Sequence, residues 1–130
     1  MELDLAAFSE ALQKNLVIIV CCSCSIHYSG RAESFLNDGD RIIIIKADKT
    51  LLIHQPAGGS PINYMKEGTA FAFGKEEGKL VLHCSNIPVK EYMDIIISKV
   101  YSFQQLQMED SESIQLAGSE RDMSDMIYSN

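Results

Sequence analysis

The chain has 130 residues and a mass of 14.5 kDa, which suffices for one domain with a modest core and leaves no room for a second full domain. Apolar residues make up 46% of it, yet the longest apolar run, Leu16 to Cys22, is far shorter than the roughly 18 residues of a membrane helix, so we expect no membrane partner. The acidic start, Met1 to Asp4, lacks the basic segment of a signal peptide, which favours a cytoplasmic protein.

The net charge of −7 is concentrated at one end of the chain. Residues 1–100 carry ten Lys and Arg against twelve Asp and Glu, which gives −2, whereas residues 101–130 carry one against six, which gives −5. Within residues 41–66, four basic residues face Asp48 alone, a local charge of +3. This stretch could meet phosphates, and it could equally be a solvated hairpin surface.

The four cysteines predict free thiols, because Cys21 and Cys22 are adjacent and the chain is expected to be intracellular. On a strand, Cys22 and Cys24 would point to one face and Cys21 to the other. Cys22, Cys24 and Cys84 could bind zinc together with His83. The usual two-residue spacing between zinc ligands is absent, however, so small buried apolar side chains are the favoured interpretation.

The first predicted elements are a helix and a long strand. Leu5, Phe8 and Leu12 fall on one helical face after Asp4, which predicts a short amphipathic helix over residues 4–14. Residues 16–28 are β-branched, apolar and rich in thiols, and their second half alternates between polar and apolar residues. This pattern predicts a strand with one buried face.

A turn, a strand and a hairpin are predicted next. Asn37 to Asp40 predict the turn. The run from Arg41 to Lys46 contains four consecutive isoleucines and predicts a strand that is buried on both faces or packs at a dimer interface. Residues 47–50 predict a tight turn into a strand at 51–54, although Lys49 occupies a position that suits glycine better.

A flexible loop is predicted at Pro56 to Pro61, which is rich in glycine and proline. It delivers Asn63 and Tyr64 at its end. Loops of this kind often carry function, so these two side chains are candidates for a binding site.

The remaining body of the chain is predicted to be β-rich. Residues 69–73 and 79–84 predict a hairpin around residues 74–78, and residues 92–103 predict a further strand. About six short strands and one helix predict a mainly β fold, a β-sandwich or half-barrel with a short leading helix.

The tail has a different character. Residues 109–113 are polar and acidic and predict a linker. Ser119, with Asp122 three residues later, resembles a capping box, so a C-terminal helix is predicted to begin there. The expected domains are an N-terminal helix at 1–15, a β-rich domain at 16–108, and a linker with the start of a helix at 109–130.

Four segments of the chain form an ordered series. They are Tyr28-Ser29-Gly30-Arg31, Gly39-Asp40-Arg41-Ile42-Ile43-Ile44-Ile45-Lys46, Leu52-Ile53-His54-Gln55 and Pro61-Ile62-Asn63-Tyr64. In order and spacing, this series resembles the amino-terminal domain of the NucS/EndoMS family of DNA endonucleases. The resemblance extends almost throughout the chain, from the first strand to the predicted helix at Ser119.

The resemblance implies a β-rich dimerisation and DNA-binding domain of a structure- or mismatch-specific endonuclease that acts in DNA repair. The catalytic half of the family lies beyond the end of this chain, so we expect no catalysis from these residues alone. The family's chemistry is metal-dependent phosphodiester cleavage, which implies a divalent metal such as magnesium for the absent nuclease domain and no cofactor in this chain. The expected partners are single-stranded, branched or mismatched DNA, a second copy in a homodimer, and a sliding clamp that would bind the absent part.

Two cationic residues are candidate DNA contacts. Arg31 matches the family's Gly-Arg position and would bind a phosphate or a base edge through its planar guanidinium. The competing interpretation is a structural ion pair with Glu33 or Asp38. Lys46 is a further candidate for phosphate contact, and its competing interpretation is a solvated strand end.

Asn63 and Tyr64 match the family's Asn-Trp pair. There an amide can hydrogen-bond a displaced base and an aromatic ring can stack on it. The competing interpretation is a turn asparagine beside a core tyrosine. Two differences from the family stand out: tyrosine replaces the usual tryptophan, which reduces the stacking area, and the preceding residues 57–60 carry no charge. Phosphate affinity should therefore depend more strongly on Arg31.

A different class of function stays open. It is a self-associating β scaffold that binds no nucleic acid and is held together by Ile42 to Ile45 and the strand at residues 92–103. The two hypotheses differ in one structural respect. Arg31 and Tyr64 together on an exposed concave face would favour DNA binding, whereas their burial in the core or a dimer interface would favour the scaffold.

Overall fold

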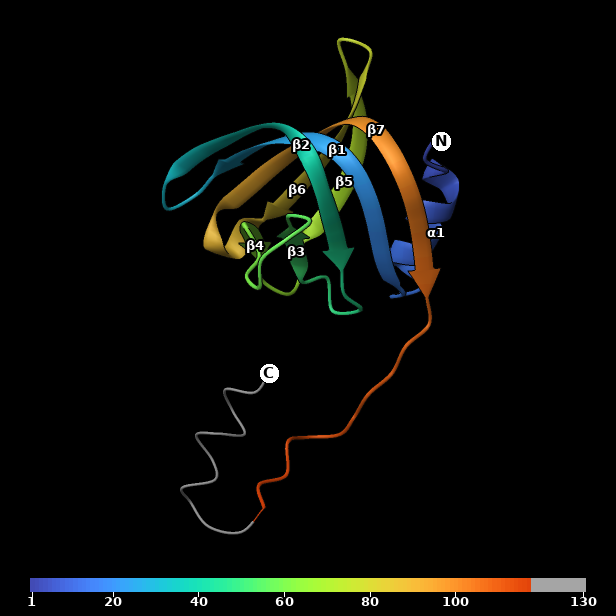
Figure 1. Ribbon diagram of the computed structural model, residues 1–130, viewed down its shortest axis with the longest axis vertical. Helices are drawn as coiled ribbons and strands as arrows, with labels where there is room; N and C mark the ends of the chain where they lie inside the picture. Colours follow the sequence, from blue (N-terminus) through green and yellow to red (C-terminus); the bar gives the residue numbers. More distant parts are fainter. Residues whose placement is uncertain (118–130) are drawn as a thin grey trace.

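The computed structural model describes residues 1–117 (Figure 1). Helix α1 spans Leu5–Gln13, and the 3-10 helix η1 spans Ile87–Val89. The strands, in chain order, are β1 Val17–Ser29, β2 Glu33–Ile45, β3 Leu51–His54, β4 Asn63–Met65, β5 Ala70–Glu76, β6 Lys79–Asn86 and β7 Glu91–Leu106. Residues 107–117 form no helix or strand. The helix predicted from Ser119 onward lies outside the described residues.

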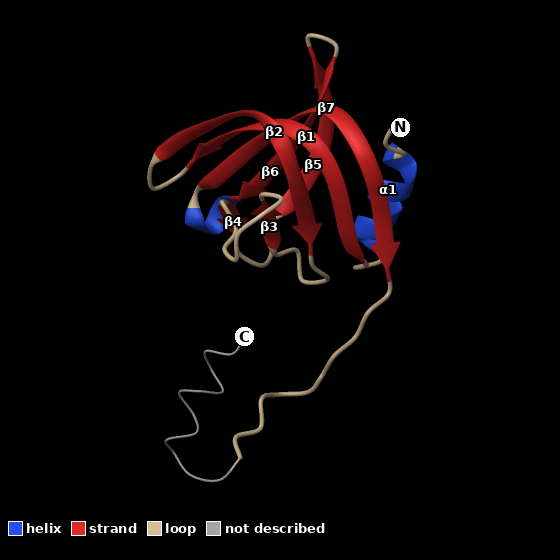
Figure 2. Cartoon of the chain, viewed as in Figure 1, coloured by secondary structure: helices blue, strands red, loops and turns tan. Residues whose placement is uncertain are grey.

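The seven strands form one antiparallel sheet in the order β4-β3-β2-β1-β7-β6-β5. This sheet curls into a half-barrel, and α1 packs against β1 (Figure 2). The predicted mainly β half-barrel with a leading helix is therefore confirmed. The sandwich is wrong, because the chain builds a single sheet whose curvature folds its inner face around its own core instead of a second sheet.

The core grows from β1, the middle strand of the sheet. Because side chains alternate along a strand, the even-numbered residues from Ile18 to Ile26 all point inward, and each is at most 2% exposed. On the neighbouring strand, Ile43 and Ile45 lie opposite Val20 and Ile18 and are buried with them. Full burial of one such side chain contributes about 1.5–3 kcal/mol, so this inner face supplies most of the stability of the domain.

Helix α1 begins and ends with local hydrogen bonds. The side chain of Asp4 accepts a hydrogen bond from the backbone N–H of Ala7 at 3.0 Å, which makes Asp4 the N-cap of the predicted helix. The helix stops where Asn15 adopts a positive φ of 57°. On its buried face, the ring of Phe8 meets Phe73 edge-on, with 4.7 Å between ring centroids, and stacks on Phe103 at 6.0 Å. Phe8 therefore joins the helix to β5 and β7.

The turn predicted at residues 37–40 is wrong, because β2 begins at Glu33 and runs through it. The chain reverses direction instead at Gly30–Ala32, where the N–H of Gly30 donates to the carbonyl of Ala32 at 3.1 Å. Glycine, asparagine and aspartate are common in turns, and here that composition has a different cause.

The cause is a buried arginine beside an irregularity in the sheet. The register between β1 and β2 shifts between Cys24 and Ile26. There the Arg41 side chain, only 7% exposed, donates to the backbone carbonyls of Cys24 and Asn37. A Cβ atom on Gly39 would lie 3.1 Å from the guanidinium, so the glycine leaves room for it. The turn-like residues therefore mark a bulge filled by an arginine.

The two hairpin turns differ in how well the sequence predicts them. The turn at residues 47–50 is confirmed, with the N–H of Lys46 donating to Thr50 at 2.9 Å and Lys49 at a φ of 70°. The hairpin between β5 and β6 is tighter than predicted, because Glu77 and Gly78 alone make the turn, both at positive φ. Among the described residues, no helix is both long and apolar enough to cross a membrane.

Candidate nucleic-acid interface

A hollow of about 350 Å³ opens where β4 faces the tip of the β1–β2 hairpin and η1. We call it the mouth pocket. Its lining residues come from three separate stretches of the chain, and they are Tyr28, Arg31, Tyr64, Lys66, Val89 and Glu91. Two aromatic rings, two cations and one carboxylate thus share one open cavity.

Gly30 determines the shape of the hairpin tip that carries Arg31. A Cβ atom at this position would lie 2.3 Å from the Tyr28 hydroxyl oxygen and 3.0 Å from Cγ of Glu91, so only glycine lets these side chains pack against the turn. Arg31 follows directly at the apex of the turn and is exposed. The Gly-Arg pair therefore has a structural reason: the glycine makes the space, and the arginine stands at the edge of the pocket.

Strand β4 turns Tyr64 away from the core. It pairs with β3 so that Tyr64 lies opposite Leu52 and Met65 opposite Leu51. Met65 is fully buried, and alternation then directs the Tyr64 ring to the other side, where it is 54% exposed. The interpretation of Tyr64 as a core tyrosine is therefore wrong.

A buried polar cluster holds the chain after β4 in place. The side-chain amide of Asn86 donates to the carbonyls of Lys66 at 3.3 Å and Glu67 at 3.2 Å. It also donates to the hydroxyl of Thr69, which in turn donates to the Lys66 carbonyl at 2.8 Å. Asn86 is 3% exposed and Thr69 is 2% exposed, so these bonds are shielded from water. They fix the backbone of Lys66, whose side chain lines the pocket.

The structure brings together two of the four predicted contact residues. Arg31 and Tyr64 line the same pocket, whereas Lys46 lies at the β2–β3 turn and does not line it. Asn63 precedes Tyr64 but is turned inward, and its side-chain oxygen is buried without a hydrogen-bond partner among the described residues.

The charges around the pocket differ from the sequence expectation. Glu33 pairs with His27 at 3.2 Å, and the described residues give Arg31 no ion-pair partner. Arg41, one of the four basic residues in the stretch 41–66, is buried and contributes nothing to the surface. Arg31 and Lys66 against Glu91 leave the mouth pocket with one net positive charge.

Four lining residues were not identified from the sequence, namely Tyr28, Lys66, Val89 and Glu91. Tyr28 stands two residues before Gly30, and Lys66 two residues after Tyr64, so each lies within reach of a recognised motif. A period-two reading of β4 would have placed Lys66 on the same side as Tyr64. Glu91 is far away in the sequence, and only the pairing of β1 with β7 brings it to the tip.

The described residues do not fit a metal ion. They contain no group of three or more His, Cys, Asp or Glu side chains placed to hold one. Cys84 points into the core while the neighbouring His83 pairs with Glu76 and Asp94 outside it, which removes the zinc alternative. Burial raises the pKa of the Cys84 thiol. The four cysteines are free thiols, as predicted.

Comparison with known proteins gives a consistent result. Residues 14–113 match the family described as the Endonuclease NucS N-terminal PH-like domain. The Endonuclease NucS of Methanocaldococcus jannaschii is 35% identical over 127 residues, which are 98% of this chain and 48% of that protein. That of Pyrococcus abyssi is 38% identical over 114 residues, 88% of this chain and 44% of that protein. The chain thus spans about half the length of the curated relatives it matches.

Comparison with solved structures leads to the same family as the sequence comparison. The chain in a structure of an EndoMS–dsDNA2 complex superposes with a TM-score of 0.82 at 32% identity, over 97% of this chain and 53% of that one. EndoMS in its apo form gives a TM-score of 0.76 at 29% identity, over 97% and 52% of the two chains. The likeness covers almost the whole of this chain in each case.

Proposed function

Because the chain belongs to the family of Endonuclease NucS N-terminal PH-like domains, we propose that it is the DNA-binding and dimerisation domain of a structure- or mismatch-specific DNA endonuclease that acts in DNA repair. The proposal is supported chiefly by one observation, the presence of Arg31 and Tyr64 in one open pocket. A similar chain in a structure with double-stranded DNA adds to this support.

The chemistry of the mouth pocket suits an unpaired nucleotide. The exposed Tyr64 ring offers a face on which a base can stack, and Tyr28 provides a second ring in the same cavity. Arg31 and Lys66 can neutralise the phosphates on either side of that base. Glu91 disfavours a phosphate in its own vicinity, so the backbone should run along the side of Arg31 and Lys66.

Removal of either side chain should weaken DNA binding. We expect Arg31→Ala and Tyr64→Ala each to lower the affinity for single-stranded DNA about tenfold, because one charge-assisted phosphate contact or one stacked base is worth about 1–3 kcal/mol. Fluorescence anisotropy with labelled single-stranded, branched and mismatched DNA measures this across a salt series. Arg31→Ala should also reduce the salt dependence of binding, whereas Tyr64→Ala should leave it unchanged.

Matched controls are available in the same chain. Lys14→Ala removes one exposed positive charge just after the C-terminal end of α1. Tyr101→Ala removes from β7 a tyrosine ring that is 48% exposed, close to the 54% of Tyr64. Both variants should bind DNA like the parent chain. If the folded chain binds none of the DNA forms at any salt concentration, or if the controls weaken binding as much as Arg31→Ala and Tyr64→Ala, the mouth pocket is not the DNA site.

The proposed homodimer would use the outer face of the sheet. Ile19, Ile44 and Leu52 lie in one row across β1, β2 and β3, and Ile42 and Cys21 lie in the next row. All five side chains are half-buried although they face away from the core. The four consecutive isoleucines of β2 place two side chains on each face of the sheet, so Ile42 and Ile44 lie on the outer face. An apolar patch of this kind on an outer face is typical of contacts between protein chains.

Introducing a charge into this patch should separate the two copies. We expect Ile44→Asp to raise the dissociation constant of the dimer at least about tenfold, since a carboxylate would be desolvated at the centre of the interface. Ala72→Asp, at an exposed position of β5, is the matched control. Sedimentation velocity over a concentration series reports the state of each variant. A parent chain that stays monomeric at every accessible concentration would rule out this interface.

Catalysis is proposed to belong to the part of the relatives that this chain does not match. There a divalent metal such as magnesium would activate water for phosphodiester cleavage, and a sliding clamp would bind. The role of residues 1–117 is then to bind and position DNA.

A further inference from the structure

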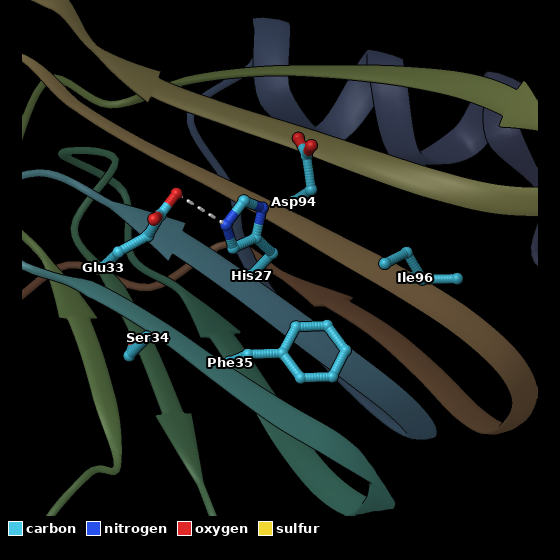
Figure 3. A pocket seen from close by; sticks show the side chains of 6 residues that line it. All are labelled: His27, Glu33, Ser34, Phe35, Asp94 and Ile96. Carbon is cyan, nitrogen blue, oxygen red and sulfur yellow. Dashed lines mark hydrogen bonds and ion pairs between the residues drawn. The ribbon is translucent and has the colours of Figure 1, made fainter.

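A second hollow lies on the outer face of the sheet and shares no lining residue with the mouth pocket. It has a volume of about 520 Å³, and we call it the outer pocket. It is lined by His27, Glu33, Ser34, Phe35, Asp94 and Ile96. Figure 3 shows Glu33 on one side of His27 and Ile96 on the other, with the Phe35 ring beside them. The pocket therefore combines an apolar wall with an acidic rim.

Strand register builds the outer pocket. His27 in β1 lies opposite both Phe35 in β2 and Asp94 in β7, so three side chains from three strands form one row. The same row continues to His83 in β6, which lies opposite Asp94. Because these residues stand on the most extensively paired strands of the sheet, the pocket is fixed by the fold and does not depend on a mobile loop.

The apolar wall is unusually open to water. The Phe35 side chain is 61% exposed although it stands on a regular strand, and its ring centroid lies 6.3 Å from that of His27. Ile96 across the pocket is half-buried. Together with Ile96, the exposed Phe35 ring offers apolar surface that a bound side chain can cover.

Charge determines what kind of molecule can fit. The carboxylates of Glu33, Asp94 and the nearby Glu76 all point to this face, and in the described residues their ion pairs go only to the imidazoles of His27 and His83, at 2.7–3.2 Å. Within residues 1–117, no Lys or Arg lines the pocket. With neutral imidazoles the face is negative, so it repels nucleic acid and attracts a cation.

We propose that the outer pocket binds an arginine side chain on an extended segment of a protein partner. A guanidinium can stack on the Phe35 ring and at the same time donate two hydrogen bonds to the carboxylate of Glu33 or Asp94. A lysine ammonium lacks the planar surface for the first contact and the fork for the second. Ile96 provides the apolar surface for the residue next to the arginine. None of the residues that line the outer pocket belongs to the mouth pocket.

The test uses the peptide acetyl-Leu-Arg-Leu-amide and, as control, the same peptide with neutral, isosteric citrulline in place of arginine. NMR spectra of the isotope-labelled chain should show shifts of the backbone amides of His27, Phe35, Asp94 and Ile96 with the arginine peptide only. The dissociation constant should be on the order of 1 mM. Phe35→Ala and Glu33→Gln should each weaken binding about fivefold, and Ile87→Ala and Glu77→Gln, two exposed positions elsewhere, should not.

Several outcomes would overturn the proposal. One is the absence of shifts at these amides up to about 10 mM peptide, and another is an equal response to the citrulline peptide. Shifts of the same amides on addition of single-stranded DNA would assign the pocket to nucleic acid instead. Shifts that grow with the concentration of the chain alone and vanish in Phe35→Ala would assign it to a contact between copies. Because DNA binding is measured in a separate experiment, a negative result with the peptide would not contradict the proposed DNA site at the mouth pocket.

Discussion

Replacing Phe8 by alanine is expected to lower the free energy of unfolding by about 3–5 kcal/mol, since this is the usual cost of truncating a fully buried aromatic side chain. Phe8 is 1% exposed and contacts the rings of Phe73 in β5 and Phe103 in β7, which belong to distant strands. The helix cannot collapse into the space without losing its own contact with β1, so a cavity should remain. Denaturant unfolding followed by circular dichroism measures the difference.

Leu5→Ala is the matched control for this variant. Leu5 lies on the same helix but is 36% exposed, so the loss should stay below about 1 kcal/mol. If Phe8→Ala unfolded at the same denaturant concentration as Leu5→Ala, helix α1 would not be part of the cooperative unit.

The second large effect is expected for Arg41→Met, which should destabilise the chain by about 2–4 kcal/mol. Methionine fills a similar volume but donates no hydrogen bond, so the carbonyls of Cys24 and Asn37 would lose their buried partner. The change should also raise the pKa of the Cys24 thiol. That pKa is held low mainly by a hydrogen bond from Cys22 and additionally by the positive charge of Arg41. Thermal and denaturant unfolding measure the stability, with the exposed Lys46→Met as control.

Gly39 provides an internal check on the same contact. Gly39→Ala places a methyl group 3.1 Å from the guanidinium and should cost about 1–2 kcal/mol in the parent chain. In the Arg41→Met background the guanidinium is absent, and the same substitution should cost distinctly less. Equal costs in both backgrounds would mean that the glycine is required by the backbone and not by the arginine.

Periodicity and turn chemistry predicted correctly those elements whose structure depends only on the local sequence. The helix after Asp4, the alternating strand β1 and the turn at Lys49 follow from local pattern, and each stands where expected. The turn predicted at residues 37–40 was wrong because glycine and aspartate occur in turns but can also serve contacts between distant side chains. Here the glycine accommodates a side chain two residues away, and Asp40 accepts a hydrogen bond from the hydroxyl of Tyr101 at 2.8 Å on β7. No local pattern reveals a contact across such a distance.

The candidate site was predictable only in part, for a similar reason. Arg31 and Tyr64 were singled out by motif, and their meeting in one pocket is a property of the curled sheet. Glu91 reaches the pocket through strand pairing, and Asn86 holds the chain near Lys66 through three side-chain hydrogen bonds. The outer pocket could not be predicted from the sequence, because His27 and Asp94 are 67 positions apart and become neighbours only in the sheet.

The pairing of β1 with β7 has a consequence for how the chain acquires its structure. The central strand of the sheet, Val17–Ser29, has as one neighbour the last strand, Glu91–Leu106. Closing so long a loop is slow, which places this domain among those that fold in milliseconds to seconds. During synthesis, the edge of β1 that pairs with β7 stays unpaired until residue 106 has left the ribosome. The isoleucine strand β2, which can pair with β1 at once, then protects its other edge from aggregation.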